Sequence, residues 1–308
     1  MDKSLHRASP IDPDEFLSSL IEEFSSRWPC LPDKPEESPT AGLRALWFAA
    51  ADQNRSVQKA GEGLLPSLNG PARDRLHHLI EQRLSGVPLA HLVGWQNFMG
   101  LEFKAGPQAL IPRKETEILG RAALQCAHEI VRKQGSAKII DVCTGSGNLA
   151  IALAAQEPAC QVFAADLSAD AVALARENAQ FHNLQERVEF RVGDLFAPFA
   201  SGDFDGAMDL IVCNPPYLST SKVNILPQEI GQFEPRAAFD AGSFGLAIIS
   251  RLISEAPRYL KTGSGLCFEV GVGQGSFFAS RLKGMNVYRQ VETVTDQGGE
   301  VRVLIAST

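Results

Sequence analysis

The strongest constraint on the fold is a regular alternation of short apolar runs and helical patterns that begins near Lys138. Each apolar run has the length and composition of a buried strand, and most are followed by a stretch with helical spacing. This alternation predicts a mostly parallel sheet covered by helices on both faces. The expected strands are 139–143, 161–166, 188–192, 210–213 and 265–270, and the expected helices are 149–156, 169–182 and 246–260.

The C-terminal tail has a different pattern. Val287–Val294 and Glu300–Ala306 each have the composition of a strand, and the turn-forming segment Asp296–Gly299 joins them. Two strands linked by such a turn are typical of an antiparallel hairpin. The prediction for this half of the chain is therefore an α/β fold of the Rossmann-like type, with a seven-stranded sheet that ends in an antiparallel hairpin.

The first part of the chain is organised differently. Residues 1–85 carry apolar side chains at helical spacing, for example Phe16, Leu20 and Phe24, and they predict a small helical domain. Residues 86–112 contain a hairpin pattern with a turn near Gly100, and we expect this segment to act as a linker. A third region, residues 113–308, then forms the predicted α/β domain.

A glycine-rich turn follows the first expected strand of the α/β domain. Glycines let the backbone approach a ligand, and amide groups at a helix N-terminus can point at it. In open α/β sheets, ligands bind at the carboxyl ends of the strands. The spacing Gly145-x-Gly147-x-x-Ala150 also fits a dinucleotide fingerprint, so the turn alone predicts a nucleoside cofactor without choosing one. The candidate cofactor-binding residues here are Asp141, Cys143, Thr144, Gly145, Ser146 and Gly147.

Acidic residues end the next two strands. Asp166 ends the second strand, where a carboxylate accepts hydrogen bonds from both ribose hydroxyls of NAD or of S-adenosylmethionine. Ser168 is placed to cap the following helix, which leaves Asp166 available for the cofactor. Leu167 lies beside it and is a further candidate cofactor-binding residue. We expect Asp194 to lie near the adenine amino group and Leu195 to cover the adenine face.

The sharpest feature of the sequence is the segment Asn214–Tyr217, which reads Asn-Pro-Pro-Tyr directly after an apolar strand. Pro215 and Pro216 stiffen the loop and remove two N–H donors. The side-chain carbonyl of Asn214 and the main-chain carbonyl of Pro215 can therefore accept both hydrogens of an NH2 group. Tyr217 can lie flat against a planar π system. These four residues are the candidate catalytic residues.

This arrangement answers a specific chemical problem. The nitrogen of an amide or an aromatic amine is a poor nucleophile because its lone pair is delocalised. Two fixed acceptors on its hydrogens favour a pyramidal nitrogen and stabilise the positive charge that develops during attack on a methyl group. Holding the nitrogen in line with a sulfonium methyl supplies the remaining effect. The combination predicts a methyltransferase that uses S-adenosylmethionine and acts on a planar nitrogen.

Taken together, these motifs resemble the HemK (PrmC) family of protein-glutamine N5-methyltransferases, and the resemblance runs from about Gly86 to the C-terminus. It implies a helical N-terminal domain that docks substrate, a hairpin linker and a Rossmann-like catalytic domain. The substrate it implies is the glutamine of the Gly-Gly-Gln loop of peptide-chain release factors. The segments that carry it are Leu110–Glu117, Asp141–Gly147, Asp166, Asn214–Tyr217 and Glu234–Asp240.

The resemblance also implies residue roles. Cys143 to Gly147, Asp166, Leu195 and Asn214 contact the cofactor, and Asn214 to Tyr217 bind the target glutamine. The family commonly has glycine where this chain has Cys143. A cysteine there is more familiar in sister enzymes that modify a large-subunit ribosomal protein, so such a protein is an alternative substrate.

Three other functions explain the sequence less well. A DNA or RNA amino-methyltransferase would share Asn214–Tyr217, but it would need a basic binding face. The chain carries 29 Lys and Arg against 36 Asp and Glu, with a formal net charge of −7. An NAD(P)-dependent oxidoreductase leaves Asn214–Tyr217 unexplained. A non-catalytic binding module would not need Asn214 and Asp166. Both residues are present, which argues against that function. We therefore expect a protein substrate and no direct nucleic-acid partner.

The cysteine spacing, the length of the apolar stretches and the polar first residues support further predictions. Its six cysteines show no metal-ligand spacing, which favours small buried side chains in a reducing compartment over a metal site. No apolar stretch approaches the ~18 residues of a membrane span. Residues 1–13 are polar and lack the apolar core of a signal peptide. We expect a cytoplasmic protein without a metal.

Overall fold

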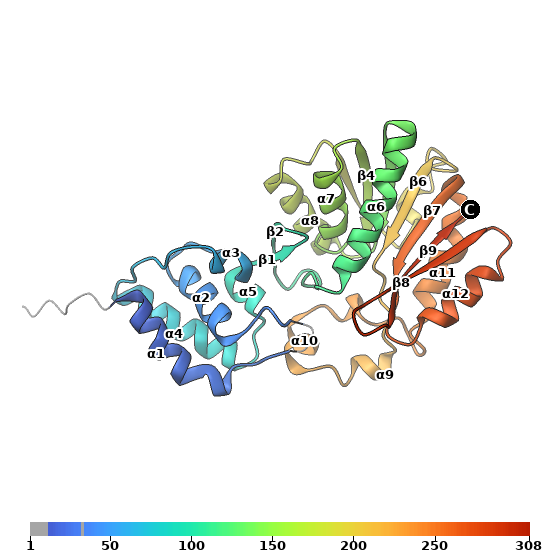
Figure 1. The fold of residues 1–308 in the computed structure, drawn as a ribbon. Coiled ribbons are helices and arrows are strands. Elements are labelled where there is room, and N and C mark those ends of the chain that lie inside the picture. Colours follow the sequence, from blue (N-terminus) through green and yellow to red (C-terminus); the bar gives the residue numbers. More distant parts are fainter. Residues whose placement is uncertain (1–11, 32–33) are drawn as a thin grey trace, which may run out of the picture. The chain divides into compact units, whose positions relative to one another are not determined.

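The computed structural model describes residues 12–31 and 34–308, so most of the polar N-terminal segment lies outside the described residues. The chain divides into two compact units, one ending at Trp95 and one running from Gln96 to Thr308 (Figure 1). Among the described residues, no helix is both long and apolar enough to cross a membrane.

The unit that ends at Trp95 is helical, as the sequence predicts. Its core contains Leu20, Trp47 and Leu76, which are buried together. Polar side chains cap the helices; Ser38 and Asn69, for example, accept hydrogen bonds from backbone amides of the helices that follow them. The elements are α1 (Pro13–Phe24), η1 (Ser25–Arg27), α2 (Pro39–Ala50), α3 (Val57–Gly61), α4 (Gly70–Leu84) and α5 (Leu89–Val93).

A short hairpin comes next in the chain, formed by β1 (Trp95–Phe98) and β2 (Leu101–Lys104). Its turn lies at Gly100, as expected, and Met99 and Gly100 have φ angles of 51° and 82°. Positive φ at both central residues is the requirement of a tight two-residue turn that matches strand twist.

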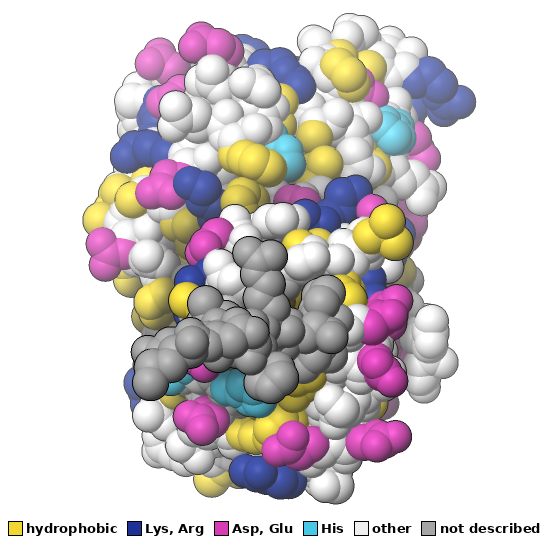
Figure 2. Space-filling model, turned by 90° about the vertical axis from the view of Figure 1, so that its left-hand side faces the viewer, with side chains coloured by type: hydrophobic (Ala, Val, Ile, Leu, Met, Phe, Trp, Pro, Cys, Tyr) yellow, Lys and Arg dark blue, Asp and Glu magenta, His cyan; other side chains and the backbone are white. Residues whose placement is uncertain are grey.

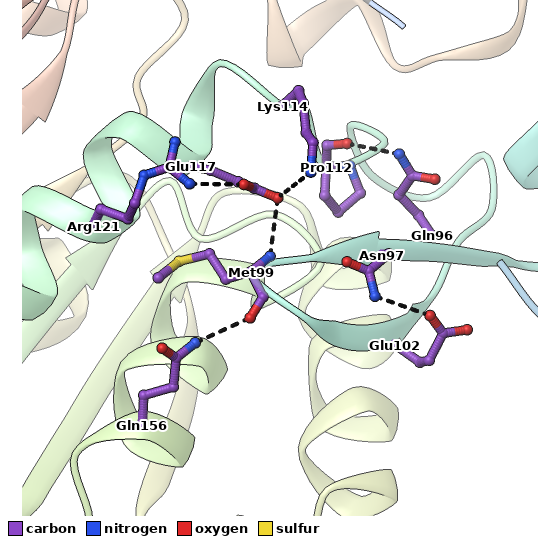
Figure 3. A network of polar contacts seen from close by, with 9 residues as sticks. All are labelled: Gln96, Asn97, Met99, Glu102, Pro112, Lys114, Glu117, Arg121 and Gln156. Carbon is purple, nitrogen blue, oxygen red and sulfur yellow. Dashed lines mark hydrogen bonds and ion pairs between the residues drawn. The ribbon is translucent and has the colours of Figure 1, made fainter. Parts of the chain in front are cut away.

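One buried carboxylate attaches this hairpin to the α/β unit. Glu117 accepts hydrogen bonds from the backbone N–H of Met99 at 3.1 Å and from Arg121 at 2.9 Å (Figure 3). Lys114 adds an ion pair at 3.1 Å. The side chain of Gln156 donates to the Met99 carbonyl from another helix. The hairpin turn is therefore held by side chains from two helices.

The α/β unit contains a seven-stranded sheet with the order β5-β4-β3-β6-β7-β9-β8. The first five strands in this order run parallel, and β9 pairs antiparallel with both β7 and β8. The predicted fold class is confirmed. The strands are β3 (Ala137–Val142), β4 (Cys160–Asp166), β5 (Val188–Val192), β6 (Met208–Cys213), β7 (Leu260–Glu269), β8 (Gln290–Thr295) and β9 (Val301–Ser307).

Two hydrophobic cores lie on opposite faces of this sheet, because alternate residues of a strand point to opposite sides. Ile139 belongs to one core and Ile140 to the other. The helices α6 (Thr116–Gln134), α7 (Asn148–Gln156) and α8 (Ala169–Phe181) pack in the first core. The helices α11 (Ala247–Glu255) and α12 (Gly275–Lys283) pack in the second.

The structure corrects three expected boundaries. The expected helix 246–260 ends at Glu255, because Ala256–Arg258 form a 3-10 turn that contains Pro257. The strand expected at 265–270 begins five residues earlier, at Leu260, and Met208 pairs with Leu260. The strand expected from Val287 begins at Gln290.

The order of the strands determines where a site can form. The chain runs outward from β3 through β4 to β5 and then returns to place β6 on the other side of β3. The edge at which the strand order reverses is where open α/β sheets bind ligands. Short elements then lie between β6 and α11, namely α9 (Thr220–Val223), α10 (Gln228–Phe233) and η3 (Arg236–Ala238).

Candidate active site

The loop after β3 has a backbone that favours glycine. Cys143, Gly145 and Gly147 have φ angles of 61°, 56° and 81°, all in the left-handed region. A Cβ atom added to Gly145 would meet nothing within 4 Å, so open space lies over this residue. A Cβ added to Gly147 would lie 3.0 Å from Ala175 and Ile151, so Gly147 is needed for packing against the core.

Polar side chains lie beneath this loop. Asp141 is fully buried and accepts a hydrogen bond from the hydroxyl of Thr144 at 2.6 Å. Burial raises the pKa of Asp141 to about 7, and the Thr144 hydrogen bond opposes that shift. The Oγ atom of Ser146 is buried and has no hydrogen-bond partner among the residues that the structure describes. The loop therefore combines a titratable carboxylate with an unsatisfied hydroxyl.

Asp166 is joined to the same loop. Its Oδ2 atom accepts from the backbone N–H of Gly145 at 2.8 Å, and its Oδ1 atom accepts from the N–H of Ser168 at 2.9 Å. Burial raises the pKa of Asp166, and these backbone hydrogen bonds oppose the shift. Ser168 caps α8 through the N–H of Ala171, as expected. Leu167 is 67% exposed beside this carboxylate.

Asp194 and Leu195, the two residues expected at the adenine, differ in their contacts and in their burial. Asp194 follows β5, and the N–H of Gly193 donates to the carbonyl of Asp166, so the two acidic residues lie on neighbouring chain segments. Arg251 forms an ion pair with Asp194 at 2.7 Å, which was not predicted from the sequence. Leu195 is only 4% exposed and has a φ of 46°.

Asn214 follows β6, the strand beside β3. Cys213 pairs with Val142, so the two loops that carry the predicted site leave adjacent strands. The Nδ2 atom of Asn214 donates to the hydroxyl of Thr116 at 3.1 Å. Pro215 is buried, and Pro216 and Tyr217 are half-buried.

Tyr217 points to a carboxylate that the sequence did not reveal. Its hydroxyl donates to Glu269 at 3.1 Å, and Glu269 ends β7 with only 2% exposure. Arg302 lies 3.5 Å from the same carboxylate. Burial raises the pKa of Glu269, whereas Arg302, Thr116 and Tyr217 lower it. A single acidic residue in an apolar strand gives no sequence pattern by which its partners could be found.

The backbone of the Asn214–Tyr217 loop is held from a second side. The side chain of Gln274 donates to the carbonyl of Tyr217 at 2.9 Å and to the carbonyl of Gly245 at 3.2 Å. Gly245 has a φ of 70°, and a Cβ atom there would lie 2.6 Å from the Tyr217 carbonyl oxygen. A glycine is therefore required where the two loop segments meet.

Two further motifs from the sequence meet at Glu234. Its carboxylate accepts from the backbone N–H of Ile111 at 2.9 Å and forms an ion pair with Arg113. The segments Leu110–Glu117 and Glu234–Asp240 are thus joined directly. Arg113 therefore has a structural role here.

Charged side chains of both signs are interspersed on the face drawn in Figure 2. This mixture fits the balance of 29 basic and 36 acidic residues in the chain. Within the described residues, that face therefore lacks the large patch of one charge sign that would attract a polyanion over a long range.

Comparisons with known proteins identify the class of fold. Residues 123–230 match the family model described as "Methyltransferase small domain". The catalytic domain of hMettl16 superimposes with a TM-score of 0.53 at 14% identity, covering 78% of this chain and 82% of that one. The fold is therefore that of the class I methyltransferases, as predicted.

Curated relatives define the family within that class. A release factor glutamine methyltransferase from Moorella thermoacetica is 34% identical over 260 residues, covering 84% of this chain and 87% of the relative. One from Geobacter sulfurreducens is 40% identical over 196 residues, covering 64% of this chain and 65% of the relative. The chain belongs to the release factor glutamine methyltransferase family, which confirms the resemblance seen in the sequence.

Proposed function

We propose that this protein transfers a methyl group from S-adenosylmethionine to the side-chain amide nitrogen of a glutamine in a peptide-chain release factor. The observation that carries the proposal is the fixed amide of Asn214. Its nitrogen is bonded to Thr116, so its carbonyl oxygen remains to accept from a substrate NH2 group. The names of the curated relatives support the substrate.

The loop after β3 fits the proposed cofactor. Open space lies over Gly145, and the buried Ser146 hydroxyl lacks a partner among the described residues. Asp166 is held by two backbone amides, and each of its oxygens keeps lone pairs for the ribose hydroxyls. Asp141, Thr144 and Gly147 shape the loop itself. Bound S-adenosylmethionine would supply an electrophilic methyl group on a sulfonium.

The residues after β6 then act on the glutamine. The carbonyls of Asn214 and Pro215 accept the two amide hydrogens and hold the nitrogen in place. This favours a pyramidal nitrogen and stabilises the positive charge that forms on it. Tyr217, fixed through Glu269, lies against the planar amide. A strong general base is unnecessary, because the alkylated nitrogen loses its proton readily.

The direct test of the function is to identify the methylated residue. The protein is incubated with labelled S-adenosylmethionine and purified release factors, and in parallel with ribosomes, and the label is mapped by mass spectrometry. We expect a single glutamine of a release factor to be modified. Label on a ribosomal protein or on RNA, with none on release factors, would show that the proposed substrate is wrong.

Asn214→Ala tests the proposed mechanism. We expect methyl transfer to fall by at least ~100-fold, the scale for removing one preorganised hydrogen-bonding group at developing charge. Binding of S-adenosylmethionine should be weakened but measurable by calorimetry. Asn286→Ala, at an exposed asparagine between α12 and β8, is the matched control and should keep wild-type turnover. Turnover retained by Asn214→Ala would contradict the mechanism.

We further propose that the helical unit ending at Trp95 docks the release factor, and that the reaction takes place in the cytoplasm. A chain beginning at Gln96 that still binds S-adenosylmethionine should methylate a short glutamine peptide as the full chain does. Its KM for the intact release factor should rise sharply. Equal KM values for the two chains would reject docking by these helices.

A further inference from the structure

We propose that Gln274 is a positioning residue for methyl transfer, because it fixes the main chain of Tyr217 and thereby the ring that lies against the substrate amide. This inference rests on the proposed function, in which Tyr217 contacts the target glutamine. Gln274 directly precedes α12, on the loop that follows β7. It belongs to none of the motifs from which the site was predicted.

The side-chain amide of Gln274 joins three loop segments. Its nitrogen donates to the carbonyl of Tyr217 at 2.9 Å, on the loop after β6, and to the carbonyl of Gly245 at 3.2 Å, shortly before α11. Its oxygen accepts from the backbone N–H of Gly271 at 3.0 Å, just after β7. These contacts use both hydrogens of the NH2 group and the oxygen.

The partners of this amide allow only one orientation. A backbone N–H can only donate, and a backbone carbonyl can only accept. The oxygen of Gln274 must therefore face Gly271, and the NH2 group must face the carbonyls of Tyr217 and Gly245. A reversed amide would place N–H against N–H and oxygen against two oxygens. A glutamate has the same shape but no NH2 group, so it cannot replace Gln274 at these contacts.

The segment from Glu269 to Gln274 holds Tyr217 at both ends. Glu269 accepts from the Tyr217 hydroxyl at 3.1 Å, and Gln274 donates to its main-chain carbonyl. Between these contacts, a Cβ atom added to Gly271 would lie 2.9 Å from Cδ2 of the Tyr217 ring, so the ring passes close to this glycine. A ring fixed only at its hydroxyl can pivot about that contact. Fixing the main chain as well determines where the ring lies.

The contact with Gly245 extends this support to a second segment. Gly245 is buried, and a Cβ atom there would lie 2.6 Å from the Tyr217 carbonyl oxygen. Nearby, the backbone N–H of Ala241 donates to the carbonyl of Leu218 at 2.9 Å. Gln274 therefore fastens two segments that also pair with each other. Its loss should let these segments separate and release Tyr217.

The first test observes these contacts directly and needs no substrate. Backbone hydrogen exchange is followed by NMR in the 15N-labelled full chain. In Gln274→Met, the amides of Gly271 and Ala241 should exchange at least ~10-fold faster than in the wild type, because one ordinary hydrogen bond protects by about that factor. Gln297→Met, at an exposed glutamine between β8 and β9, is the matched control and should leave both rates unchanged. Wild-type exchange at either amide in Gln274→Met would overturn the proposal.

The second test separates positioning from a general loss of structure. Gln274→Met and Gln274→Glu should each lower kcat on a release factor by ~10- to 100-fold, the scale of a misplaced reacting group. The Kd for S-adenosylmethionine should stay unchanged, because the hydrogen bonds of Gln274 are to other loops than the one after β3. Wild-type kcat in either variant would overturn the proposal, and a fall in the free energy of unfolding alone would show a merely structural role.

A double-mutant cycle identifies the residue through which Gln274 acts. Tyr217→Ala keeps the main-chain carbonyl and removes the ring. Because Gln274 acts by placing that ring, Gln274→Met should lower the residual kcat of Tyr217→Ala by no more than ~2-fold. Losses that multiply in the double variant would show that Gln274 acts through another group and would overturn the proposal.

The outcomes distinguish this inference from the proposed function. If the wild type methylates release factors and the Gln274 variants keep its kcat, the positioning role is wrong. If the wild type leaves release factors unmodified, the proposed function fails. Hydrogen exchange at Gly271 and Ala241 then still decides whether Gln274 holds the loop that contains Tyr217.

Discussion

Asp166→Ala examines the two roles that the structure gives to one carboxylate. The sequence predicts a ribose contact for Asp166, and the structure adds hydrogen bonds to the N–H groups of Gly145 and Ser168. The substitution removes the acceptor for all of these groups at once. It should therefore weaken cofactor binding and loosen the loop that contains Gly145.

The two effects have different sizes. A hydrogen bond from a ribose hydroxyl to a charged acceptor is worth about 1.5–3 kcal/mol, which corresponds to a Kd about 10- to 150-fold higher. Water can reach the two amides once the side chain of Asp166 is gone, because this residue is only partly buried. The free energy of unfolding without ligand should fall by less, about 1–2 kcal/mol.

Calorimetry with S-adenosylmethionine and urea denaturation of the free protein measure the two effects separately. Both are done at one pH well above the ordinary range of a carboxyl group, because burial raises the pKa of Asp166 and the carboxylate should be ionised. Asp170→Ala, at an exposed residue in the first turn of α8, is the matched control. An unchanged Kd in Asp166→Ala would refute the ribose contact, and unchanged stability would refute the role of Asp166 in holding the loop.

Three further substitutions test other parts of the structure. Burial raises the pKa of Asp141 from 3.8 to about 7, so wild-type stability should fall as the pH rises through that window. The free energy of unfolding of Asp141→Asn, measured by urea denaturation, should not show this fall of about 1.4 kcal/mol per pKa unit. Parallel pH profiles for the variant and the wild type would contradict the burial argument. Cys143→Gly should raise the free energy of unfolding by about 1 kcal/mol, because it relieves a φ of 61°; a loss would mean that thiol packing outweighs the strain. Hydrogen bonds from Met99, Lys114 and Arg121 outweigh burial and lower the pKa of Glu117, so Glu117→Gln should cost about 1–3 kcal/mol at neutral pH. That difference should disappear as the pH falls below 4.5, and a difference that persists in acid would have another origin.

Much of this fold could be predicted because burial leaves a periodic trace in the sequence. The parallel strands are continuous apolar runs, and the helix after Ser168 has a recognisable cap. The start of β7 escaped prediction because residues 261–264 are polar and at most partly buried, although they continue a paired strand. The end of α11 was predicted too late in the chain, because Pro257, which ends the helix, stands within a pattern that otherwise has helical spacing.

The candidate site was predictable to a similar extent. Motifs that are continuous in sequence, such as Asn214–Tyr217 and Asp141–Gly147, could be recognised directly. The side chains that contact the Asn214–Tyr217 segment could not, because Thr116 and Glu269 are single residues on elements far apart in the chain. Their meeting depends on which strands become neighbours, and the sequence does not encode that locally. The same reasoning applies to the ion pair of Asp194 with Arg251.

The fixed carbonyl of Asn214 also has a consequence for selectivity. Deamidation of the target glutamine would replace its NH2 group with a carboxylate oxygen, which would face the oxygen of Asn214 and be repelled. The singly methylated product has one N–H left for two acceptors, so its second methylation is disfavoured and its release is favoured. On the proposed function, one oriented amide thus accounts for the rejection of glutamate and for stopping after a single transfer.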